Sequence, residues 1–492
     1  MRLLRGLNPV PTAEQRIFNK STNKNIWQVY SPLALSWFFM AWEGQLALWL
    51  IGQMPNTKVN QAGFLIIMGI AIFIESPVID LLSTGTTLGT TKARFQTITR
   101  FTLILMAWVT VAHCAVVFSP AYNYVAQVLL DAPANVAQAA WYGLAWMPIW
   151  SAAVGWRRYR QGIMIRAGKT GPISWGTLIR MTVMFIVGYI LFASKVMTGL
   201  GIIGVSFTAA VIAEAIYIHI ASQPVLKNLP DANQNHESDT PFLPPGERLG
   251  EGKTKSNFEN QNDLGKGHFQ PSTQHLTIPQ IFKFHLPLTA STILMLTTPF
   301  FLTRSLNEGT QPIIAMAAWQ IASTVVWLFR ASTFALPEAV ISLYQVGREK
   351  LLLRFCTQVG FGISSLMLIF HFLNLDYFIF TQIYRAEPHV AERAALAFLW
   401  SAFIPALNSF MGYFRGLLTA HHITSARMIA IGFSLLSLGA ALYFGLMLNP
   451  LSVVLAAAAL TIAHVVELLT LAIYWKRSAH NTPHKPVPSD SA

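Results

Sequence analysis

The feature that most constrains this chain is a series of long apolar stretches that recurs along almost its whole length of 492 residues. A helix needs about 20 mostly apolar residues to cross the roughly 30 Å hydrocarbon core of a bilayer, and these stretches meet that requirement. Only 11% of the residues are charged, which is about half the share that a soluble protein uses to cover its surface. The sequence therefore predicts an all-α polytopic membrane protein of about twelve transmembrane helices.

The predicted spans form two sets of six. Arg157, Arg158 and Arg160 interrupt the apolar pattern near the end of the fourth span. The first set is Tyr30–Met54, Gln61–Leu82, Thr97–Phe118, Val136–Ile163, Ile173–Ala193 and Gly199–Ala221. The second set is Ile278–Ser305, Pro312–Leu343, Leu351–Leu373, Ala391–Leu418, Ala426–Leu446 and Leu451–Trp475.

The placement of lysine and arginine predicts the orientation, because basic residues collect in cytoplasmic loops. Most of the 34 basic residues fall on one side if both chain termini are cytoplasmic. The net charge of +13 then reflects topology and attraction to anionic lipid headgroups, and we expect no nucleic-acid partner. With two cysteines in separate apolar segments and no eukaryotic sorting signal, the sequence fits a bacterial inner membrane.

The sequence repeats itself on either side of a polar segment. Pro32-Leu33 is followed 255 residues later by Pro287-Leu288, and YNYVAQVLLDAP at 122–133 is echoed by YFIFTQIYRAEP at 377–388. An even number of spans gives both halves the same orientation, so we expect two six-helix bundles related by a pseudo-twofold axis along the membrane normal. Further pairs at offsets of 257 and 253 are Pro148 with Pro405 and Glu214 with Glu467.

The predicted domain organisation follows from this repeat. The polar segment between the halves cannot bury enough apolar area to fold alone, so we expect a disordered cytoplasmic linker. Residues 119–133 and 374–388 are too short to span and are typical of interfacial helices. The expected parts are a cytoplasmic N-terminal segment at 1–28, an N-lobe at 29–221, the linker at 222–277, a C-lobe at 278–476 and a cytoplasmic tail at 477–492.

Two homologous halves of six helices predict a secondary transporter, because this symmetry gives a cavity between two lobes that rock against each other. A duplicated membrane scaffold without transport activity is one alternative. An intramembrane enzyme is another, but the chain has no HExxH, GxSxG, paired-aspartate or phosphate-loop motif, and we expect no enzymatic activity. We also expect no cofactor and no metal site, and a monomer whose partners are the lipid bilayer, a small-molecule substrate and a coupling proton or sodium ion.

Charged residues within the spans are the candidate functional residues. A charge at bilayer depth costs at least about 2.5–3.5 kcal/mol and therefore faces protein or water. Arg304 and Arg330 are the predicted substrate-binding residues, because a guanidinium can hold a carboxylate or phosphate through its planar donors. The predicted gating or ion-coupling residues are Glu43, Glu75, Asp80 and Glu338.

One pair of these charges suggests a contact between the halves. Glu75 and Arg330 are 255 residues apart, so we hypothesise that they pair across the space between the lobes or share a substrate; an ion pair within one lobe is the alternative. Glu214 and Glu467 lie near helix ends, which favours an interfacial or helix-packing role. The prolines predicted to kink helices near these charges are Pro77, Pro299 and Pro337.

Short segments resemble one transporter family. Ser76-Pro77-Val78-Ile79-Asp80, followed by Gly85, is similar to a Gly-Pro-x-x-Asp segment of the progressive ankylosis (ANK/ANKH) transporters. That family belongs to the MOP superfamily, with the MATE exporters and MurJ-type lipid flippases. Further likenesses are PFFLTRSL at 299–306 with a Pro…Phe-Val-Ser-Arg-Asp-Leu stretch, EGQLAL at 43–48 with a Glu-Gln-Ala-Leu element, and RGLL at 415–418 with a charged turn.

The resemblance implies a V-shaped, alternating-access fold and export of small organic or phosphorylated anions of the citrate, pyrophosphate or nucleotide class. The chain departs from the family at Ser305, where the family has Asp. The four acidic residues named above outnumber the two arginines, so charge alone leaves the sign of the substrate open. A MATE-like proton- or sodium-coupled exporter of cationic compounds and a MurJ-like lipid flippase are therefore the alternatives.

Overall fold

The computed structural model describes residues 13–231 and 276–481, except for residues 168, 170, 198, 345–348, 422, 424, 449 and 450. The regular elements of the described chain are helices. The first half contains α1 (Ala13–Gly52), α2 (Thr57–Ile79), α3 (Leu81–Leu88), α4 (Lys92–Val117), α5 (Ala121–Asn123), the π-helical η1 (Tyr124–Leu129), α6 (Ala134–Leu144), α7 (Trp150–Arg166), α8 (Gly171–Ser194) and α9 (Leu200–Lys227). The second half contains α10 (Ile278–Leu296), α11 (Thr298–Glu308), α12 (Pro312–Arg330), the 3₁₀-helical η2 (Ala331–Ala335), α13 (Leu336–Leu343), α14 (Glu349–Phe372), α15 (Leu375–Phe378), the π-helical η3 (Ile379–Ile383), α16 (Pro388–Trp400), α17 (Ile404–Ala420), α18 (Ser425–Met447) and α19 (Ser452–Asn481).

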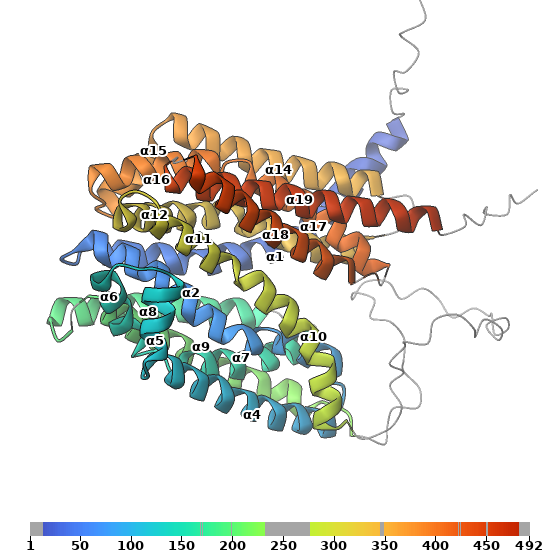
Figure 1. The fold of residues 1–492 in the computed structure, drawn as a ribbon. Helices are drawn as coiled ribbons and strands as arrows, with labels where there is room; N and C mark the ends of the chain where they lie inside the picture. Colours follow the sequence, from blue (N-terminus) through green and yellow to red (C-terminus); the bar gives the residue numbers. More distant parts are fainter. Residues whose placement is uncertain are drawn as a thin grey trace, which may run out of the picture.

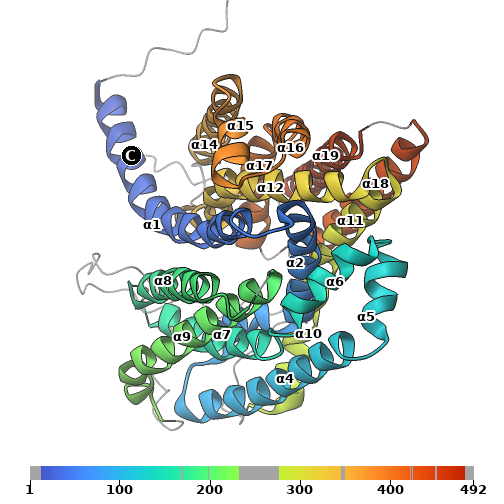
Figure 2. The same cartoon turned by 90° about the vertical axis from the view of Figure 1, so that its left-hand side faces the viewer.

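The helices form two lobes, an N-lobe of α1–α9 and a C-lobe of α10–α19. In Figure 1 the C-lobe lies above the N-lobe, except for α10, which runs down beside the N-lobe. The end of the bundle where α5 and α15 lie is called the distal end below. The end where α1 begins and α19 ends is called the terminal end (Figure 1). Helices α2 and α12 pack against each other at the centre, and Figure 2 shows them side by side where the lobes meet.

The predicted polytopic all-α fold is confirmed, with eleven described segments long and apolar enough to cross a membrane. Helices α6 and α7 together occupy the place of the predicted fourth span, and their counterparts α16 and α17 form one of the eleven. Helices α6 and α7 have 11 and 17 residues and are separated by a turn, so neither alone is long enough to be recognised as a span. Helix α1 begins well before the predicted start at 29, and α9 continues to Lys227, into the predicted linker. Most of that linker, at 232–275, and the ends at 1–12 and 482–492 lie outside the described residues.

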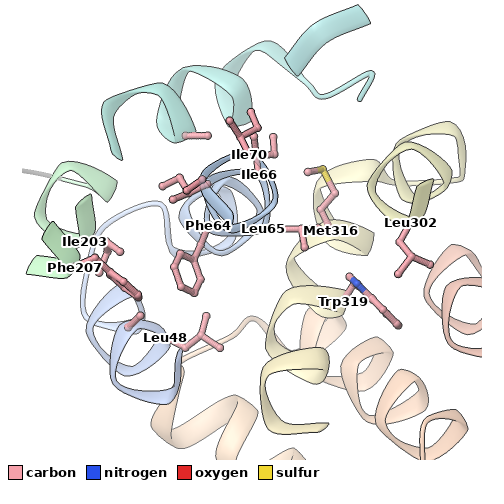
Figure 3. Packing of buried hydrophobic residues seen from close by; sticks show 14 of the residues in the cluster. Leu48, Phe64, Leu65, Ile66, Ile70, Ile203, Phe207, Leu302, Met316 and Trp319 are labelled. Atoms are coloured by element: carbon pink, nitrogen blue, oxygen red, sulfur yellow. The ribbon is translucent and has the colours of Figure 1, made fainter. Parts of the chain in front are cut away.

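Helix α2 joins the two lobes through its side chains. Phe64 points towards Leu48 of α1 and Phe207 of α9, whereas Leu65 points towards Met316 of α12 in the opposite lobe (Figure 3). All five of these side chains are at most 8% exposed. Because lipid tails are as apolar as leucine, such helices associate through close van der Waals packing rather than through the hydrophobic effect.

The backbone shows the repeat that the sequence predicts. Asn56 and Gln311, which precede α2 and α12, both have φ of 55° and lie at the offset of 255. Asp131 and Arg385, which follow η1 and η3, have φ of 54° and 49° and lie at an offset of 254. The two halves therefore use the same unusual backbone turns at equivalent positions, including a π-helical segment in each.

All three predicted kink prolines stand at interruptions of a span. Pro77 lies near the end of α2, just before the break at Asp80 that separates α2 from α3. Proline has no N–H to donate, and the Oγ of Ser76 instead bonds the carbonyl of Phe73 at 2.7 Å. Pro299 and Pro337 occupy the first turns of α11 and α13, after breaks in the seventh and eighth spans.

Close packing between α3 and α7 gives a first prediction. A Cβ added at Gly162 of α7 would lie 2.3 Å from the carbonyl oxygen of Leu82 and 2.8 Å from the nitrogen of Thr86. We expect Gly162→Ala to destabilise the protein by about 1–3 kcal/mol, because backbone atoms must move apart. Thermal unfolding in detergent micelles measures this. In the matched control Gly69→Ala, the added Cβ meets nothing within 4 Å; equal melting of both variants would contradict the close contact.

Candidate functional site

A layer of direct polar contacts joins the lobes at the distal end. Lys58 Nζ of α2 lies 2.8 Å from the carboxylate of Glu387, which precedes α16. Gln61 Nε2 donates to the carbonyl oxygen of Tyr384 at 3.1 Å. The Tyr384 hydroxyl donates to Gln45 Oε1, and Gln45 Nε2 donates to the carbonyl oxygen of Thr324 at 2.7 Å. Burial raises the pKa of Tyr384, so the phenol stays protonated as this donor.

Arg304 belongs to the same end of the molecule. Its Nε lies 2.5 Å from Glu308, and its Nη1 donates to the carbonyl oxygen of Val128 beside η1 at 2.7 Å. Asn307 Nδ2 donates to the carbonyl oxygen of Leu130 at 2.7 Å. These bonds connect α11 of the C-lobe to the η1 segment of the N-lobe. The substrate-binding role of Arg304 stays a prediction, and its contacts favour a part in holding the distal end together.

The N-lobe contains a buried cluster of ion pairs from four helices. Arg180 of α8 places Nη2 3.3 Å from Glu43 of α1 and Nη1 3.5 Å from Glu214 of α9. Arg157 of α7 lies 3.2 Å from the other oxygen of Glu214, which also accepts a hydrogen bond from Gln161 at 3.2 Å. Arg157, Arg180 and Glu214 are at most 5% exposed.

Glu75 and Arg158 complete this cluster electrostatically. Glu75 of α2 is 6% exposed and interacts with Arg157, Arg158, Arg180 and Glu43. It takes part in none of the ion pairs within the described chain, and it does not pair with Arg330 as hypothesised. The structure thus brings the predicted Glu43 and Glu75 together, in one lobe. The cluster holds three arginines and three glutamates: Arg157, Arg158, Arg180, Glu43, Glu75 and Glu214.

Sequence reasoning missed the arginines of this cluster. The run at 157–160 interrupts an apolar span, which we interpreted as a weak boundary rather than as charges inside the bundle. Glu214, for which the sequence favours an interfacial or helix-packing role, is fully buried and forms ion pairs with arginines of two neighbouring helices. The available signal was the combination of basic residues in α7 and α8 with acidic residues in α1, α2 and α9, which cannot remain unpaired in lipid.

The C-lobe has a smaller and more basic arrangement. Arg415 of α17 pairs with Glu467 of α19, which is the repeat equivalent of the Gln161–Glu214 contact at offsets of 254 and 253. Arg330 interacts electrostatically with both Arg415 and Glu467. Its guanidinium lies 5.5 Å from the ring centre of Trp327 and 5.2 Å from that of Phe334. Cation–π contacts therefore hold Arg330, while the one neighbouring carboxylate is already bound by Arg415.

Charges from the two lobes approach each other in the terminal half without direct pairing. Asp80 of the N-lobe is hydrogen-bonded to Thr292 of α10 and interacts electrostatically with Arg427 of α18 and with Arg158. Arg427 also interacts with Glu338 of α13. Arg427 and Glu338 are exposed although both lie within membrane-spanning segments. The structure therefore brings the predicted Asp80 and Glu338 near one arginine, and Asp80 also interacts with Arg158 of the Glu43 and Glu75 cluster.

Solved structures share this architecture. A MATE-family multidrug resistance transporter of the MOP superfamily in its inward-facing conformation matches with a TM-score of 0.65 and 13% identity over 93% of this chain and 99% of that chain. The lipid II flippase MurJ in an inward closed conformation matches with a TM-score of 0.63 and 14% identity over 90% of this chain and 87% of that one. The Vibrio cholerae MATE transporter VcmN in its bent form matches with a TM-score of 0.56 and 14% identity over 94% and 98%.

These likenesses show the fold, which is that of the MATE and MOP-superfamily transporters. No protein-family model matches the chain, and no curated protein matches it in sequence. The narrower resemblance to the progressive ankylosis transporters therefore stays a prediction.

The buried cluster gives a second prediction. Replacing Arg180 by Met removes the partner of Glu43 and one partner of Glu214, and we expect a loss of about 3–5 kcal/mol in unfolding free energy. Adding Glu43→Gln to Arg180→Met should recover part of this loss. Arg393→Met is the control, because Arg393 is half-buried and donates to the uncharged Gln311 Oε1 at 2.6 Å rather than to a carboxylate. Denaturant unfolding in micelles distinguishes the variants; an equal, small effect of both would argue against the cluster.

Proposed function

We propose that this protein is a secondary transporter that works by alternating access between its two lobes. The observation that carries the proposal is one-sided charge pairing between the lobes. The inter-lobe ion pair of Lys58 with Glu387 lies at the distal end. In the terminal half the opposite charges Asp80 and Arg427 face each other without an ion pair, and the direct contacts between the lobes there are hydrogen bonds. This arrangement is what a transporter requires when it is closed on one side of the membrane and open on the other.

The reverse state follows from the same contacts. Rocking the lobes apart at the distal end breaks the Lys58–Glu387 pair and the bonds of Tyr384. Closing the terminal half then brings Asp80 towards Arg427, and the new ion pair offsets part of what the distal end loses. Asp80 and Glu338 act as gate residues in this scheme. Glu338 is exposed in the present state, and the half-buried Asp80 is hydrogen-bonded to Thr292, so neither is an isolated charge in lipid.

The balance of charge favours an anionic substrate at the C-lobe. The N-lobe cluster is neutral when all its members are charged, since three arginines face three glutamates. The C-lobe group has one excess positive charge, since its arginines outnumber its carboxylates by three to two. Arg330 makes no ion pair within the described chain, and its stacked guanidinium presents planar donors to a carboxylate or phosphate. The members of the group are Arg330, Arg415, Arg427, Glu338 and Glu467.

The N-lobe supports the coupling step of the proposal. Glu75 is buried beside three arginines but makes no direct ion pair with them, and one oxygen of Glu43 has no hydrogen-bond partner. Carboxylates with spare acceptor capacity are suited to taking up a proton or sodium ion. We therefore assign ion coupling to Glu43 and Glu75, and export of small organic or phosphorylated anions to the protein as a whole, in line with the family resemblance.

Transport by reconstituted protein tests the substrate class. Proteoliposomes loaded with labelled citrate, pyrophosphate or ATP should release at least one of these anions, and Arg330→Gln should slow release at least about tenfold, with Arg330→Lys between the two. Arg393→Gln is the control and should release the anion at the normal rate. Anion release that is indifferent to Arg330→Gln would remove Arg330 from the site. Uptake of a cationic dye under a proton gradient, or lipid scrambling, would instead favour the MATE-like or MurJ-like alternative.

Cross-linking tests the alternating-access step. Lys58→Cys and Glu387→Cys place two thiols across the closed distal end, in a background of Cys114→Ala and Cys356→Ala. A short thiol-reactive cross-linker should join them and abolish transport, because the distal end can no longer open. A reducible cross-linker should give the same loss, and reduction should restore the rate. Either single cysteine variant treated in the same way should keep transporting. Full transport by the cross-linked protein would rule out rocking at this end.

A further inference from the structure

The first helix of each half crosses to the other lobe and makes the same kind of contact there. Tyr30 of α1 donates from its hydroxyl to the carbonyl oxygen of Ser332 at 3.2 Å, and its ring lies 5.3 Å from that of Phe355 at 81°. His285 of α10 has Nε2 2.7 Å from the carbonyl oxygen of Pro77, and its ring lies 5.3 Å from that of Phe101 at 76°. These contacts are called the Tyr30 tie and the His285 tie.

The two ties are copies of each other under the repeat. Tyr30 and His285 are 255 residues apart, as are the acceptors Pro77 and Ser332, and the two phenylalanines are 254 apart. The four side chains are at most 5% exposed: Tyr30, His285, Phe101 and Phe355. Because equivalent positions in both halves reproduce donor, acceptor and edge-to-face ring, the pair of ties follows the symmetry of the fold.

Each tie contacts the other lobe at a helix break. Pro77 lies just before the break between α2 and α3, and Ser332 lies in η2 between α12 and α13. Breaks leave carbonyl groups outside regular helical bonding, so they can accept a bond from a neighbouring helix. The ties therefore join the lobes where the second span of each half is already bent, away from the distal bonds that must open.

The ties differ in chemistry, because imidazole takes up a proton near neutral pH and phenol does not. The Nδ1 of His285 lies 2.8 Å from Thr84 Oγ1, and Thr84 is also 3.2 Å from the carbonyl oxygen of Asp80. A neutral ring accepts from the Thr84 hydroxyl. A protonated ring donates to it, and Thr84 then donates to the Asp80 carbonyl. Both protonation states are thus satisfied in this geometry.

Burial opposes a charge on His285, which is 3% exposed, and the neighbouring charge that favours its protonated form is Asp80. The Asp80 side chain, at the α2–α3 junction, interacts electrostatically with His285. Arg427 of α18 and Arg158 of α7 act on Asp80, and α4 contributes the uncharged ring of Phe101. On protonation both ring nitrogens become donors and the ring attracts Asp80, which makes the bond to Pro77 charge-assisted and stronger.

We propose that the two ties are the pivots on which the lobes turn, and that His285 makes one pivot responsive to protons. Protonation strengthens the His285 tie and favours the lobe arrangement described above, closed at the distal end. Loss of the proton weakens the tie, so the arrangement closed at the distal end is no longer favoured. This inference rests on the proposed alternating access and adds to it a residue that positions the lobes without touching substrate.

Distance measurements between spin labels test the proposal on the full chain. Arg100→Cys in α4 and Arg354→Cys in α14 place labels on exposed residues of opposite lobes, in a background of Cys114→Ala and Cys356→Ala. Between about pH 4.5 and about pH 8, the distance distribution of the otherwise unaltered chain should shift from one population towards a second. His285→Tyr, which installs the residue of the other tie, and His285→Gln, which keeps a donor, should both lose the shift. Tyr30→His should enlarge it.

Two results would overturn the proposal: a distribution that does not change with pH in the chain with His285, or a shift of equal size in both His285 variants. The two variants guard against loss of folding in either one, and Tyr30→His provides a gain rather than a loss. The measurement needs no substrate. Its failure would therefore leave the anion-release and cross-linking experiments standing, and failure of those experiments would be seen independently of His285.

Discussion

The cost of a charge in a low-dielectric interior is the constraint on which the rest of this structure depends. Arg157 and Arg180 are almost completely buried, and each is stabilised there by an ion pair with Glu214. Glu43 extends the same cluster to α1, so four helices of the N-lobe are joined by ionic contacts at membrane depth. Van der Waals packing holds the helices together but does not by itself specify which face of each helix points inward. The ion pairs do, because they require the charged faces of α1, α7, α8 and α9 to point towards one another.

The two lobes share one architecture because of the repeat, but equivalent positions in them carry different charges. Gln161 and Arg415 occupy equivalent positions and both bind the glutamate of the last helix, yet one is neutral and the other is cationic. Glu75 and Arg330 are equivalent by sequence offset and opposite in charge. Each therefore finds its partners within its own lobe. Duplication followed by such substitutions can produce a neutral N-lobe and a basic C-lobe on one scaffold.

The fold was largely predictable from the sequence, and the site only in part. Apolar length determines the spans, and the repeat determines how the halves are oriented, because both are properties of the local sequence. Glu43, Glu75, Asp80, Glu338 and Arg330 could be recognised as charges inside spans. Their partners could not, because pairing depends on how helices rotate and on where α1 and α10 cross to the opposite lobe. For this reason the hypothesised ion pair of Glu75 with Arg330 is not formed in the structure, a shared substrate stays a prediction, and α7 was not recognised as a carrier of buried arginines.

The distal contacts between the lobes depend largely on main-chain acceptors, which limits how far they depend on the amino-acid sequence there. Their acceptors at the π-helical turns are main-chain carbonyls, namely those of Val128, Leu130 and Tyr384. A backbone oxygen is present whatever side chain the position carries. The outward-pointing residues of η1 and η3 can thus be replaced without removing the acceptors that keep this end shut. The side chains on the distal surface can therefore change during evolution while the main-chain hydrogen bonds that close this end are kept.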